Sequence, residues 1–263
     1  MQKAIITGMR GAVGRVLAEY LKEQEVMVVG WSRGEIPVDN EAAIRSYLSH
    51  KKPDYLFHLA TASQSTGMEN ESWVVNVLWT ELLARVCDEL DIKFVFTSSV
   101  MVFNDYAIGP FATTTTPNAS EGYGYEKYTA EVRVAGVNPN AFIMRLGWQI
   151  GTSAGSNNMV DFMETQMRDN GKISASRRWY PATSFIVDTV STMWQLVQRR
   201  PSLYMLDSNR RWTFYEIAEA LNHLHGSKWV IEADDSFIYE QRMIDPRVPI
   251  PPLIVRLPTL PYG

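Results

Sequence analysis

The sequence predicts an α/β protein with a parallel sheet that is doubly wound, followed by a small C-terminal lobe. Short apolar segments alternate with amphipathic helical patterns over the first 150 residues. The chain of 263 residues is long enough to bury one large core, and the regular alternation fades after about Gly151. We therefore expect a sheet domain over residues 1–150 and a mixed α/β lobe, partly interleaved with it, over residues 151–263.

The sheet domain is predicted from short apolar runs for its strands and from an i, i+3, i+4 spacing of apolar residues for its helices. Strands are expected at residues 4–6, 26–29, 54–57, 94–96 and 142–144, and helices at 13–21, 42–48, 73–90 and 123–135. Strands that alternate with helices predict a parallel sheet covered on both faces. Right-handed crossovers then make this sheet doubly wound.

The C-terminal lobe shows a less regular pattern. Helices are expected at residues 158–168, 187–198 and 213–224, and short strands near 203–206 and 229–231. The tail from Asp245 contains six prolines, at positions 246, 249, 251, 252, 258 and 261, so we expect it to be irregular.

Composition and charge exclude several classes of protein. The chain has 25 Lys and Arg against 29 Asp and Glu, which gives a net charge of −4 and no basic footprint for DNA or RNA. The single cysteine, Cys87, excludes an internal disulfide and a multi-cysteine zinc site and fits a reducing cytoplasm. The four histidines lack metal-ligand spacing, and no uncharged apolar run reaches about 18 residues. An apolar strand begins at Ala4, so we expect no secretory leader. From the histidine spacing, the apolar runs and the net charge we expect no metal, no membrane partner and no nucleic-acid partner.

A glycine-rich turn follows the first strand and carries the first functional signal. Residues Gly8–Gly14, which follow Thr7, read Gly-x-x-Gly-x-x-Gly. Gly8 allows a tight turn, Gly11 lets the backbone approach a pyrophosphate, and Gly14 lets the helix lie close to the sheet. The N–H groups of that helix attract phosphate, so the turn predicts a dinucleotide site on a Rossmann-type sheet. The residues expected there are Gly8, Arg10, Gly11, Ala12, Val13 and Gly14.

The end of the second strand indicates which dinucleotide is bound. Sites for NAD usually carry an acidic residue there to hold the ribose 2′-OH. This chain has Ser32 and Arg33 instead. A guanidinium binds phosphate through two donors, so these residues favour the 2′-phosphate of NADP over NAD.

A Tyr-x-x-x-Lys pattern occurs at Tyr123 and Lys127, a spacing that places both side chains on one helix face. A nearby ammonium lowers the pKa of a phenol, so we expect Tyr123 to exchange a proton near neutral pH. The same pattern at Tyr47 is interpreted as surface helix. Only Tyr123 is preceded by a strand that ends in a serine, Ser99, at the carboxyl edge of the sheet.

These motifs together resemble the extended short-chain dehydrogenase/reductase superfamily, and within it the dTDP-4-dehydrorhamnose reductase family. The resemblance is carried by Thr7–Gly14, Ser98–Phe103 and Tyr123–Lys127, and it covers residues 3–150 well. Further matches are the loop His58–Ala62, Asn76, Arg145–Trp148 and Pro181–Thr183.

The resemblance implies a role for each matching residue. Tyr123 is the proton donor to a ketone oxygen, Ser99 hydrogen-bonds that oxygen, and Lys127 anchors the nicotinamide ribose and tunes Tyr123. The cofactor delivers hydride to the carbonyl carbon. Cofactor contacts are implied for Asp39, Asn40, Leu59, Ala60 and Thr61. Substrate contacts are expected for Ser99, Trp148, Arg177 and Arg178.

Val100 and Met101 limit the reactions that the resemblance implies. Sugar-nucleotide dehydratases carry Asp-Glu after the catalytic hydroxyl residue, and epimerase-reductases carry a cysteine. Val100 and Met101 stand there instead, so both activities are excluded. We expect an NADPH-dependent reductase of a 4-keto-6-deoxy sugar nucleotide in the cytoplasm, and a homodimer. Two alternatives stay open: an NAD-retaining sugar-nucleotide 4-epimerase, and an NADP-binding regulatory subunit without catalysis.

Overall fold

The computed structural model describes residues 1–62, 66–152 and 157–262, and the chain divides into two compact units. Unit 1 comprises Met1–Asn104, Pro117–Arg145 and Met193–Tyr204, and unit 2 comprises Asp105–Thr116, Leu146–Thr192 and Met205–Gly263. Both units are therefore built from segments that are far apart in the sequence.

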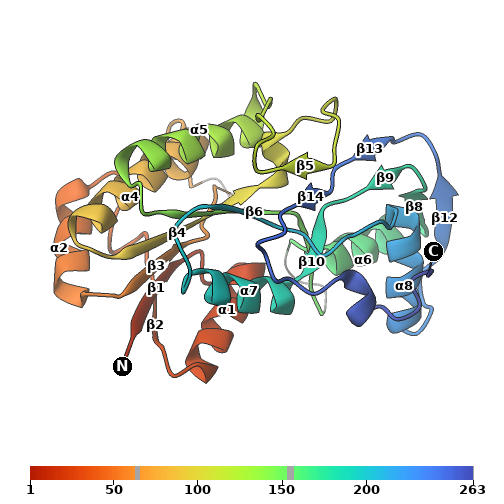
Figure 1. Ribbon diagram of the computed structural model, residues 1–263, viewed down its shortest axis with the longest axis horizontal. Coiled ribbons are helices and arrows are strands. Elements are labelled where there is room, and N and C mark those ends of the chain that lie inside the picture. The colour runs from red at the N-terminus through yellow and green to blue at the C-terminus, as the bar shows by residue number, and fades with distance from the viewer. Residues whose placement is uncertain (63–65, 153–156, 263) are drawn as a thin grey trace. The chain divides into compact units, whose positions relative to one another are not determined.

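Unit 1 is built on a six-stranded sheet with the order β11-β6-β4-β3-β1-β2 (Figure 1). Its strands are β1 (Lys3–Thr7), β2 (Met27–Gly30), β3 (Tyr55–His58), β4 (Lys93–Ser99), β6 (Phe142–Leu146) and β11 (Leu203–Leu206). The pairs β1/β2, β1/β3 and β3/β4 are parallel. The predicted α/β class with a parallel Rossmann-type sheet is confirmed.

The helices of unit 1 cover both faces of the sheet. They are α1 (Ala12–Glu23), α2 (Glu41–Lys51), α3 (Glu71–Trp73), the π-helical turn η1 (Val74–Leu78), α4 (Trp79–Glu89), the 3-10 turn η2 (Val100–Val102) and α5 (Gly122–Val137). Figure 1 shows α4 and α5 on one face and α1 on the opposite face. The single helix predicted over residues 73–90 thus contains a π-helical turn in its first half.

Unit 2 consists of short parallel strand pairs and helices. Its elements are β5 (Phe111–Ala112), β7 (Trp148–Ile150), α6 (Met159–Asn170), β8 (Ile173–Ser176), β9 (Trp179–Tyr180), β10 (Thr183–Phe185), α7 (Ile186–Leu196), α8 (Phe214–Leu224), β12 (Ile231–Asp234), β13 (Tyr239–Glu240), β14 (Met243–Ile244) and the 3-10 turn η3 (Leu253–Val255). The strands pair as β10/β7, β12/β8, β13/β9 and β14/β5. Three elements, β6, α7 and β11, contain residues of both units.

The strand expected at residues 229–231 begins two residues later than predicted. The Asn222 side chain donates to the Trp229 carbonyl at 2.9 Å and accepts from the Trp229 N–H at 2.9 Å. Because both backbone groups of Trp229 are engaged by a side chain, ladder pairing starts only at Ile231.

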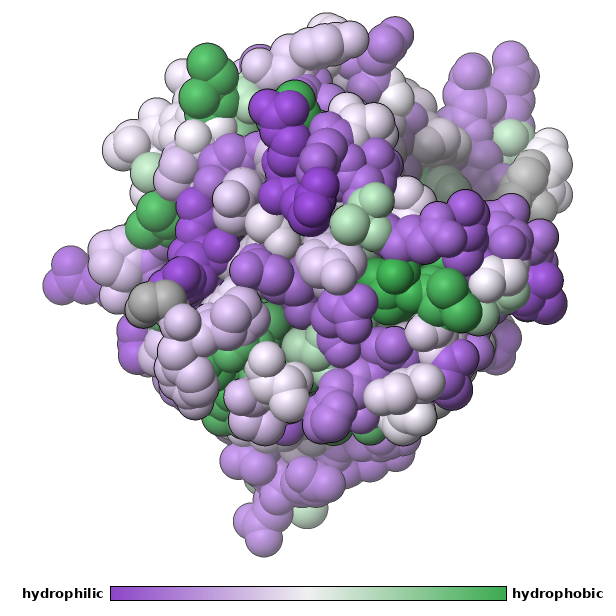
Figure 2. Space-filling view, turned by 90° about the vertical axis from the view of Figure 1, so that its right-hand side faces the viewer, coloured by the Kyte–Doolittle hydropathy of each residue, from purple (hydrophilic) through white to green (hydrophobic). Residues whose placement is uncertain are grey.

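Apolar side chains of each unit pack into a core of its own. The core of unit 1 joins β1, β3 and β4 to α2, α4 and α5, and the core of unit 2 joins α6 and α8 to β7 and β8. The surface over β12 and β13 is largely hydrophilic, with apolar residues in small separate groups (Figure 2). Among the helices of the described residues, none is long and apolar enough to cross a membrane.

Candidate functional site

The turn after β1 is packed so tightly that only glycine fits at two positions. Gly8 has a φ of +70°, and a side chain there would place its Cβ 2.8 Å from the Ala60 nitrogen. A Cβ at Gly14 would overlap the Gly8 carbonyl oxygen. The Gly11 N–H donates to that same carbonyl at 3.0 Å. The start of α1 therefore lies directly against the turn and the end of β3.

The N-terminus of α1 offers unpaired donors to an anion. Its N-cap residue, Gly11, supplies no side-chain cap, and the first turn contains no acidic residue. The free N–H groups and the helix dipole both favour a negatively charged ligand. A pyrophosphate group fits this arrangement. At Gly8 and Gly14 a side chain would collide with backbone atoms, so the surface of the turn is formed by backbone. Ala12 and Val13 form the first turn of this helix.

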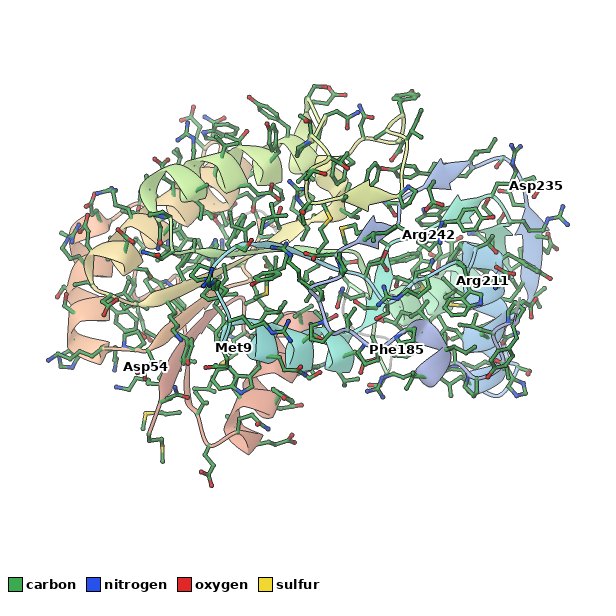
Figure 3. All side chains as sticks on the ribbon, in the orientation of Figure 1. Met9, Asp54, Phe185, Arg211, Asp235 and Arg242 are labelled. Atoms are coloured by element: carbon green, nitrogen blue, oxygen red, sulfur yellow. The ribbon has the colours of Figure 1, made fainter. Side chains whose placement is uncertain are left out.

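A cavity of about 640 Å³ opens beside this turn. Eight residues expected to bind the cofactor line it: Gly8, Arg10, Gly11, Ser32, Arg33, Leu59, Ala60 and Thr61. Met9, which is labelled in Figure 3, also lines the cavity, and its side chain covers Gly30. The described lining of this cavity includes neither Asp39 nor Asn40; the Asn40 side chain instead caps α2 by accepting from the Ala43 N–H at 2.9 Å.

Arg33 is held at the cavity by a carboxylate that the sequence reasoning missed. Its Nη1 lies 3.4 Å from Glu71 Oε1, and the other Glu71 oxygen accepts from the Thr66 N–H at 2.6 Å. The pKa of Glu71 is lowered, mainly by the hydrogen bond from Thr66 and also by Arg33. Glu71 is therefore ionised and orients the arginine. No local pattern marks this pair, because 38 residues separate its members.

Two tryptophans at the cavity were also missed. Trp31 follows β2 directly, and Trp79 begins α4. Their rings meet edge to face with centroids 5.8 Å apart, and Trp31 also contacts Tyr47 at 5.1 Å. For Trp31 the available signal was a large aromatic residue at the carboxyl end of a predicted strand, where ligands bind in such sheets.

Tyr123 and Lys127 share one face of α5. The Lys127 ammonium lies 5.7 Å from the centroid of the Tyr123 ring and 4.4 Å from that of Phe96. Lys127 is 1% exposed, and burial lowers its pKa to about 7, although the carboxylates of Glu131 and Glu126 raise it. Among the described residues, its ammonium has ring contacts but no hydrogen-bond partner.

The pKa of Tyr123 shifts in the direction opposite to the one expected. Although 37% of the Tyr123 side chain is exposed, the protein atoms packed around it desolvate the phenol and raise its pKa above the usual value of 10, and the negative charge of Glu126 adds to the effect. Lys127 does not reverse this shift because its own ammonium is destabilised by burial. The phenol therefore keeps its proton at neutral pH.

Ser99 is placed on the segment against which α5 packs. A side chain at Gly124, next to Tyr123, would overlap the Met101 carbonyl oxygen, so α5 and η2 meet backbone to backbone. The Ser99 Oγ accepts from the Met101 N–H at 3.1 Å, which leaves its own proton free to be donated. The structure thus brings the helix of Tyr123 against the residues that follow Ser99.

The residues of unit 2 expected to bind substrate are largely engaged within that unit. Arg177 pairs with Asp235 through two contacts of 3.0 and 2.5 Å; Asp235 is labelled in Figure 3. Trp148 stacks on Trp179 with centroids 5.7 Å apart and an interplanar angle of 17°. Arg178 is exposed.

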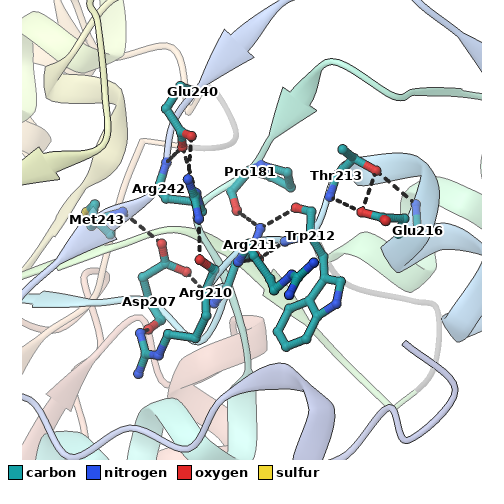
Figure 4. A network of polar contacts seen from close by, with 11 residues as sticks. Pro181, Asp207, Arg210, Arg211, Trp212, Thr213, Glu216, Glu240, Arg242 and Met243 are labelled. Atoms are coloured by element: carbon teal, nitrogen blue, oxygen red, sulfur yellow. Dashed lines mark hydrogen bonds and ion pairs between the residues drawn. The ribbon is translucent and has the colours of Figure 1, made fainter. Parts of the chain in front are cut away.

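A polar network in unit 2 surrounds the buried carboxylate of Asp207 (Figure 4). This carboxylate accepts hydrogen bonds from the N–H groups of Thr183, Asn209 and Met243 at 3.0, 2.8 and 2.8 Å. Because the three donors come from separate segments, Asp207 joins those segments. No cluster of three or more potential metal-ligating side chains occurs within the described residues.

Sequence comparisons place the chain among known relatives. The family model described as "RmlD substrate binding domain" matches residues 2–233. The "Probable low-salt glycan biosynthesis reductase Agl14" of Haloferax volcanii is 30% identical over 60% of this chain and 57% of its own length. The "Methionine adenosyltransferase 2 subunit beta" of Xenopus tropicalis is 25% identical over 84% of this chain and 71% of its own. The chain therefore spans little more than half of the Haloferax relative.

A solved structure shows the same fold. The dTDP-4-dehydrorhamnose reductase of Bacillus anthracis, in complex with NADP, superposes with a TM-score of 0.83 at 18% identity and covers 99% of this chain and 98% of that one. The family match extends over most of the chain and includes the turn, the cavity and the Tyr123–Lys127 helix. The chain belongs to the RmlD substrate-binding domain family.

Proposed function

We propose that the chain is an NADPH-dependent reductase of a 4-keto-6-deoxy sugar nucleotide, with Tyr123 as the proton donor. The observation that supports this proposal is the close packing of α5 against η2, where Gly124, next to Tyr123, meets the Met101 carbonyl, two residues after Ser99. The Lys127 ammonium faces the Tyr123 ring and has no hydrogen-bond partner among the described residues. Reductases among the relatives, including a dTDP-4-dehydrorhamnose reductase of Mycolicibacterium smegmatis, support the choice of substrate class.

The residues around the cavity suit a phosphorylated dinucleotide. The N–H groups at the start of α1 would hold the pyrophosphate, and Arg33 and Ser32 would hold the 2′-phosphate. Lys127 would donate to the nicotinamide ribose. NADP in the Bacillus anthracis structure supports this choice of cofactor.

The chemistry assigned to the chain is proton transfer and stabilisation of charge. When bound, NADPH supplies the hydride that the carbonyl carbon accepts. Tyr123 and Ser99 donate hydrogen bonds to the carbonyl oxygen, which becomes negatively charged as the reaction proceeds. Tyr123 then gives its proton to that oxygen, and its raised pKa ensures that the proton is present at neutral pH. Arg178 is the candidate for the substrate diphosphate, because Arg177 is already paired with Asp235.

The direct test is an NADPH-oxidation assay against a panel of 4-keto sugar nucleotides, with the products identified by NMR. We expect oxidation of NADPH to match formation of a 4-hydroxy product. Purified protein that carries stoichiometric NAD and consumes no NADPH would instead indicate a 4-epimerase. Oxidation of NADPH by none of the substrates would contradict the proposed reductase.

A second candidate is an NADP-binding regulatory subunit. It is favoured by the match to the methionine adenosyltransferase 2 subunit beta, which extends over 84% of this chain. In that case the chain would bind NADPH without turnover and co-elute with a methionine adenosyltransferase on gel filtration. Turnover that depends on Tyr123 would decide against this candidate.

A further inference from the structure

His58 lies at the centre of unit 1 and takes part in no step of the proposed reaction. It ends β3 and is fully buried. Its Nδ1 lies 2.8 Å from Thr7 Oγ1, and its Nε2 lies 2.9 Å from Thr80 Oγ1. The ring meets Trp79 edge to face and stacks against both Phe94 and Phe96. An imidazole between two threonine hydroxyls is a polar bridge through an otherwise apolar core.

The neighbouring hydrogen bonds fix where the protons of this bridge lie. Thr7 Oγ1 accepts from the N–H groups of Leu59 and Ala60, both at 3.2 Å. A hydroxyl has two acceptor sites and one proton, so Thr7 must donate its proton to His58 Nδ1. A neutral ring then carries its proton on Nε2 and donates it to Thr80.

The bridge ends on one side at the floor of the cofactor cavity. Leu59 and Ala60 line the cavity, and a Cβ on Gly8 would lie 2.8 Å from the Ala60 nitrogen. The Ala60 backbone and the phosphate-binding turn are thus in direct contact. A small shift of the Leu59–Ala60 segment would move the Gly8 turn with it.

The other side of the bridge reaches the helix of the Tyr–Lys pair. The Thr80 hydroxyl donates to the Asn76 carbonyl, in the π-helical turn, at 2.9 Å. The Asn76 side chain accepts from the Ala62 N–H at 3.1 Å and donates to Glu126 Oε2 at 2.7 Å. Glu126 precedes Lys127 on α5. One continuous network therefore connects the floor of the cavity to α5.

We propose that His58 is a positioning residue, held neutral with its proton on Nε2, and that the chain of hydrogen bonds Thr80–His58–Thr7 fixes the Leu59–Ala60 floor for cofactor binding. A protonated ring would donate from both nitrogens and leave the Thr7 proton without an acceptor. Burial, together with the charge of Lys127, lowers the pKa of His58 well below its usual value, which agrees with a neutral ring. This proposal depends on the proposed function only in taking NADPH as the cofactor.

The first test examines the ring itself by ¹⁵N NMR. In a His50→Gln/His223→Gln/His225→Gln variant, His58 is the only remaining histidine. We expect the Nε2–H tautomer and no titration between about pH 5 and pH 8, the range in which an unperturbed histidine changes charge. An Nδ1–H tautomer, or a titration within this range, would overturn the assignment.

The second test breaks the bridge at Thr80, away from the cavity floor. Thr80→Val keeps the shape of the side chain and removes the acceptor for Nε2, so we expect NADPH to bind about tenfold more weakly, the loss typical of one buried hydrogen bond. Thr80→Ser restores the hydroxyl and should restore affinity. Thr189→Val is the matched control, because it removes a buried threonine hydroxyl bonded to Gln149 and Ser184 in unit 2.

The two valine variants separate positioning from stability. Both should lower the melting temperature, but only Thr80→Val should change the dissociation constant for NADPH, measured by its fluorescence. Equal dissociation constants for the wild type and folded Thr80→Val would overturn the proposal. Both measurements concern the ring and cofactor binding, so an inactive chain that binds NADPH would refute the reductase function and leave this inference intact.

Discussion

Each unit buries an ionisable side chain whose pKa burial moves to about 7, and the two units surround that side chain in different ways. In unit 1, Lys127 contacts the faces of Phe96 and Tyr123 and has no hydrogen-bond partner among the described residues. In unit 2, Asp207 accepts three backbone hydrogen bonds. Burial moves the pKa of both groups to about 7, downward for the lysine and upward for the aspartate.

This difference separates a group held ready for a ligand from a group that holds the chain together. Glu131, the carboxylate nearest to Lys127 along the helix face, is paired with Arg145 by two bonds of 2.9 and 2.6 Å. It attracts the ammonium but is not available to bind it. Among the described residues the Lys127 ammonium contacts only aromatic rings, and we propose that a bound ligand supplies its hydrogen-bond partner. The fully bonded Asp207 is structural.

The largest expected effect is a loss of turnover in unit 1, when Tyr123, the residue beside Lys127 on α5, is replaced. Tyr123→Phe removes the proposed proton donor, so turnover should fall by roughly 10²–10⁴-fold while NADPH binding stays nearly unchanged. Tyr125→Phe, on the same helix and 40% exposed, is the matched control and should keep full turnover. Steady-state assays and NADPH titrations of both variants measure these effects. Full activity of Tyr123→Phe would end the assignment.

Alanine substitutions at two helical glycines test whether the glycine turn of unit 1 is shaped to bind the phosphates of NADPH. Gly14→Ala places a Cβ against the Gly8 carbonyl and should weaken NADPH binding by about 100-fold, since overpacking of this kind costs about 3 kcal/mol. Gly136→Ala in α5 meets nothing within 4 Å and should bind NADPH normally. Calorimetric titration compares the two. Similar affinities would show that the turn does not position the cofactor.

Arg33 distinguishes the two dinucleotides. Arg33→Ala removes a charged donor from the cavity, so we expect NADPH to bind about 10- to 50-fold more weakly, the value of a charge-assisted hydrogen bond. NADH, which lacks the 2′-phosphate, should bind almost as before. Dissociation constants for both cofactors measure the selectivity. Equal losses for the two would show that Arg33 does not contact the 2′-phosphate.

The smallest effect is on stability, and it has opposite pH dependence in the two units. The folded-state pKa of Lys127 lies below its unfolded value, so its burial costs most below about pH 7 and the cost disappears toward pH 10. Lys127→Met should therefore have a higher free energy of unfolding than the wild type at pH 6, by on the order of 1–3 kcal/mol. This difference should be smaller at pH 9. Urea unfolding at the two pH values measures this advantage.

Asp207 supplies the contrasting control for that experiment. Its folded-state pKa is raised from 3.8 to about 7, so the stability of the wild type falls as pH rises from about 4 to 7. Asp207→Asn should be less stable than the wild type, because one backbone donor loses its acceptor. The difference in the free energy of unfolding should become smaller as the pH rises from about 4 to 7. A Lys127→Met variant that is less stable than the wild type at pH 6 would contradict the comparison.

The parts of unit 1 that local sequence determines were predictable. The strands β1, β3 and β4, the glycine turn and the Tyr123–Lys127 spacing all depend on short-range patterns. The cavity residues Trp31 and Trp79, and Glu71, which pairs with Arg33 at the cavity, were missed because their roles come from contacts between distant segments. The π-helical turn at Val74–Leu78 likewise has no marker in the periodicity. In unit 2, the pairing of Asn222 with Trp229 displaced a strand that local apolarity had indicated.

The pKa of Tyr123 was predicted in the wrong direction for the same reason. The sequence shows that an ammonium lies one helical turn away from the phenol, but not that surrounding protein atoms desolvate both groups. Desolvation opposes the charged form of each group, so the lysine becomes less charged and the tyrosine keeps its proton.

The claim that Lys127 is held for a ligand is tested most directly by proton uptake when NADPH binds. Calorimetric titration at pH 8 in buffers of different ionisation enthalpy measures the number of protons taken up. An ammonium with a pKa of about 7 is mostly neutral at this pH, and contact with the cofactor should recharge it. We predict net uptake in the wild type that is lost in Lys127→Met. The same uptake in both proteins, or none in the wild type, would contradict the account.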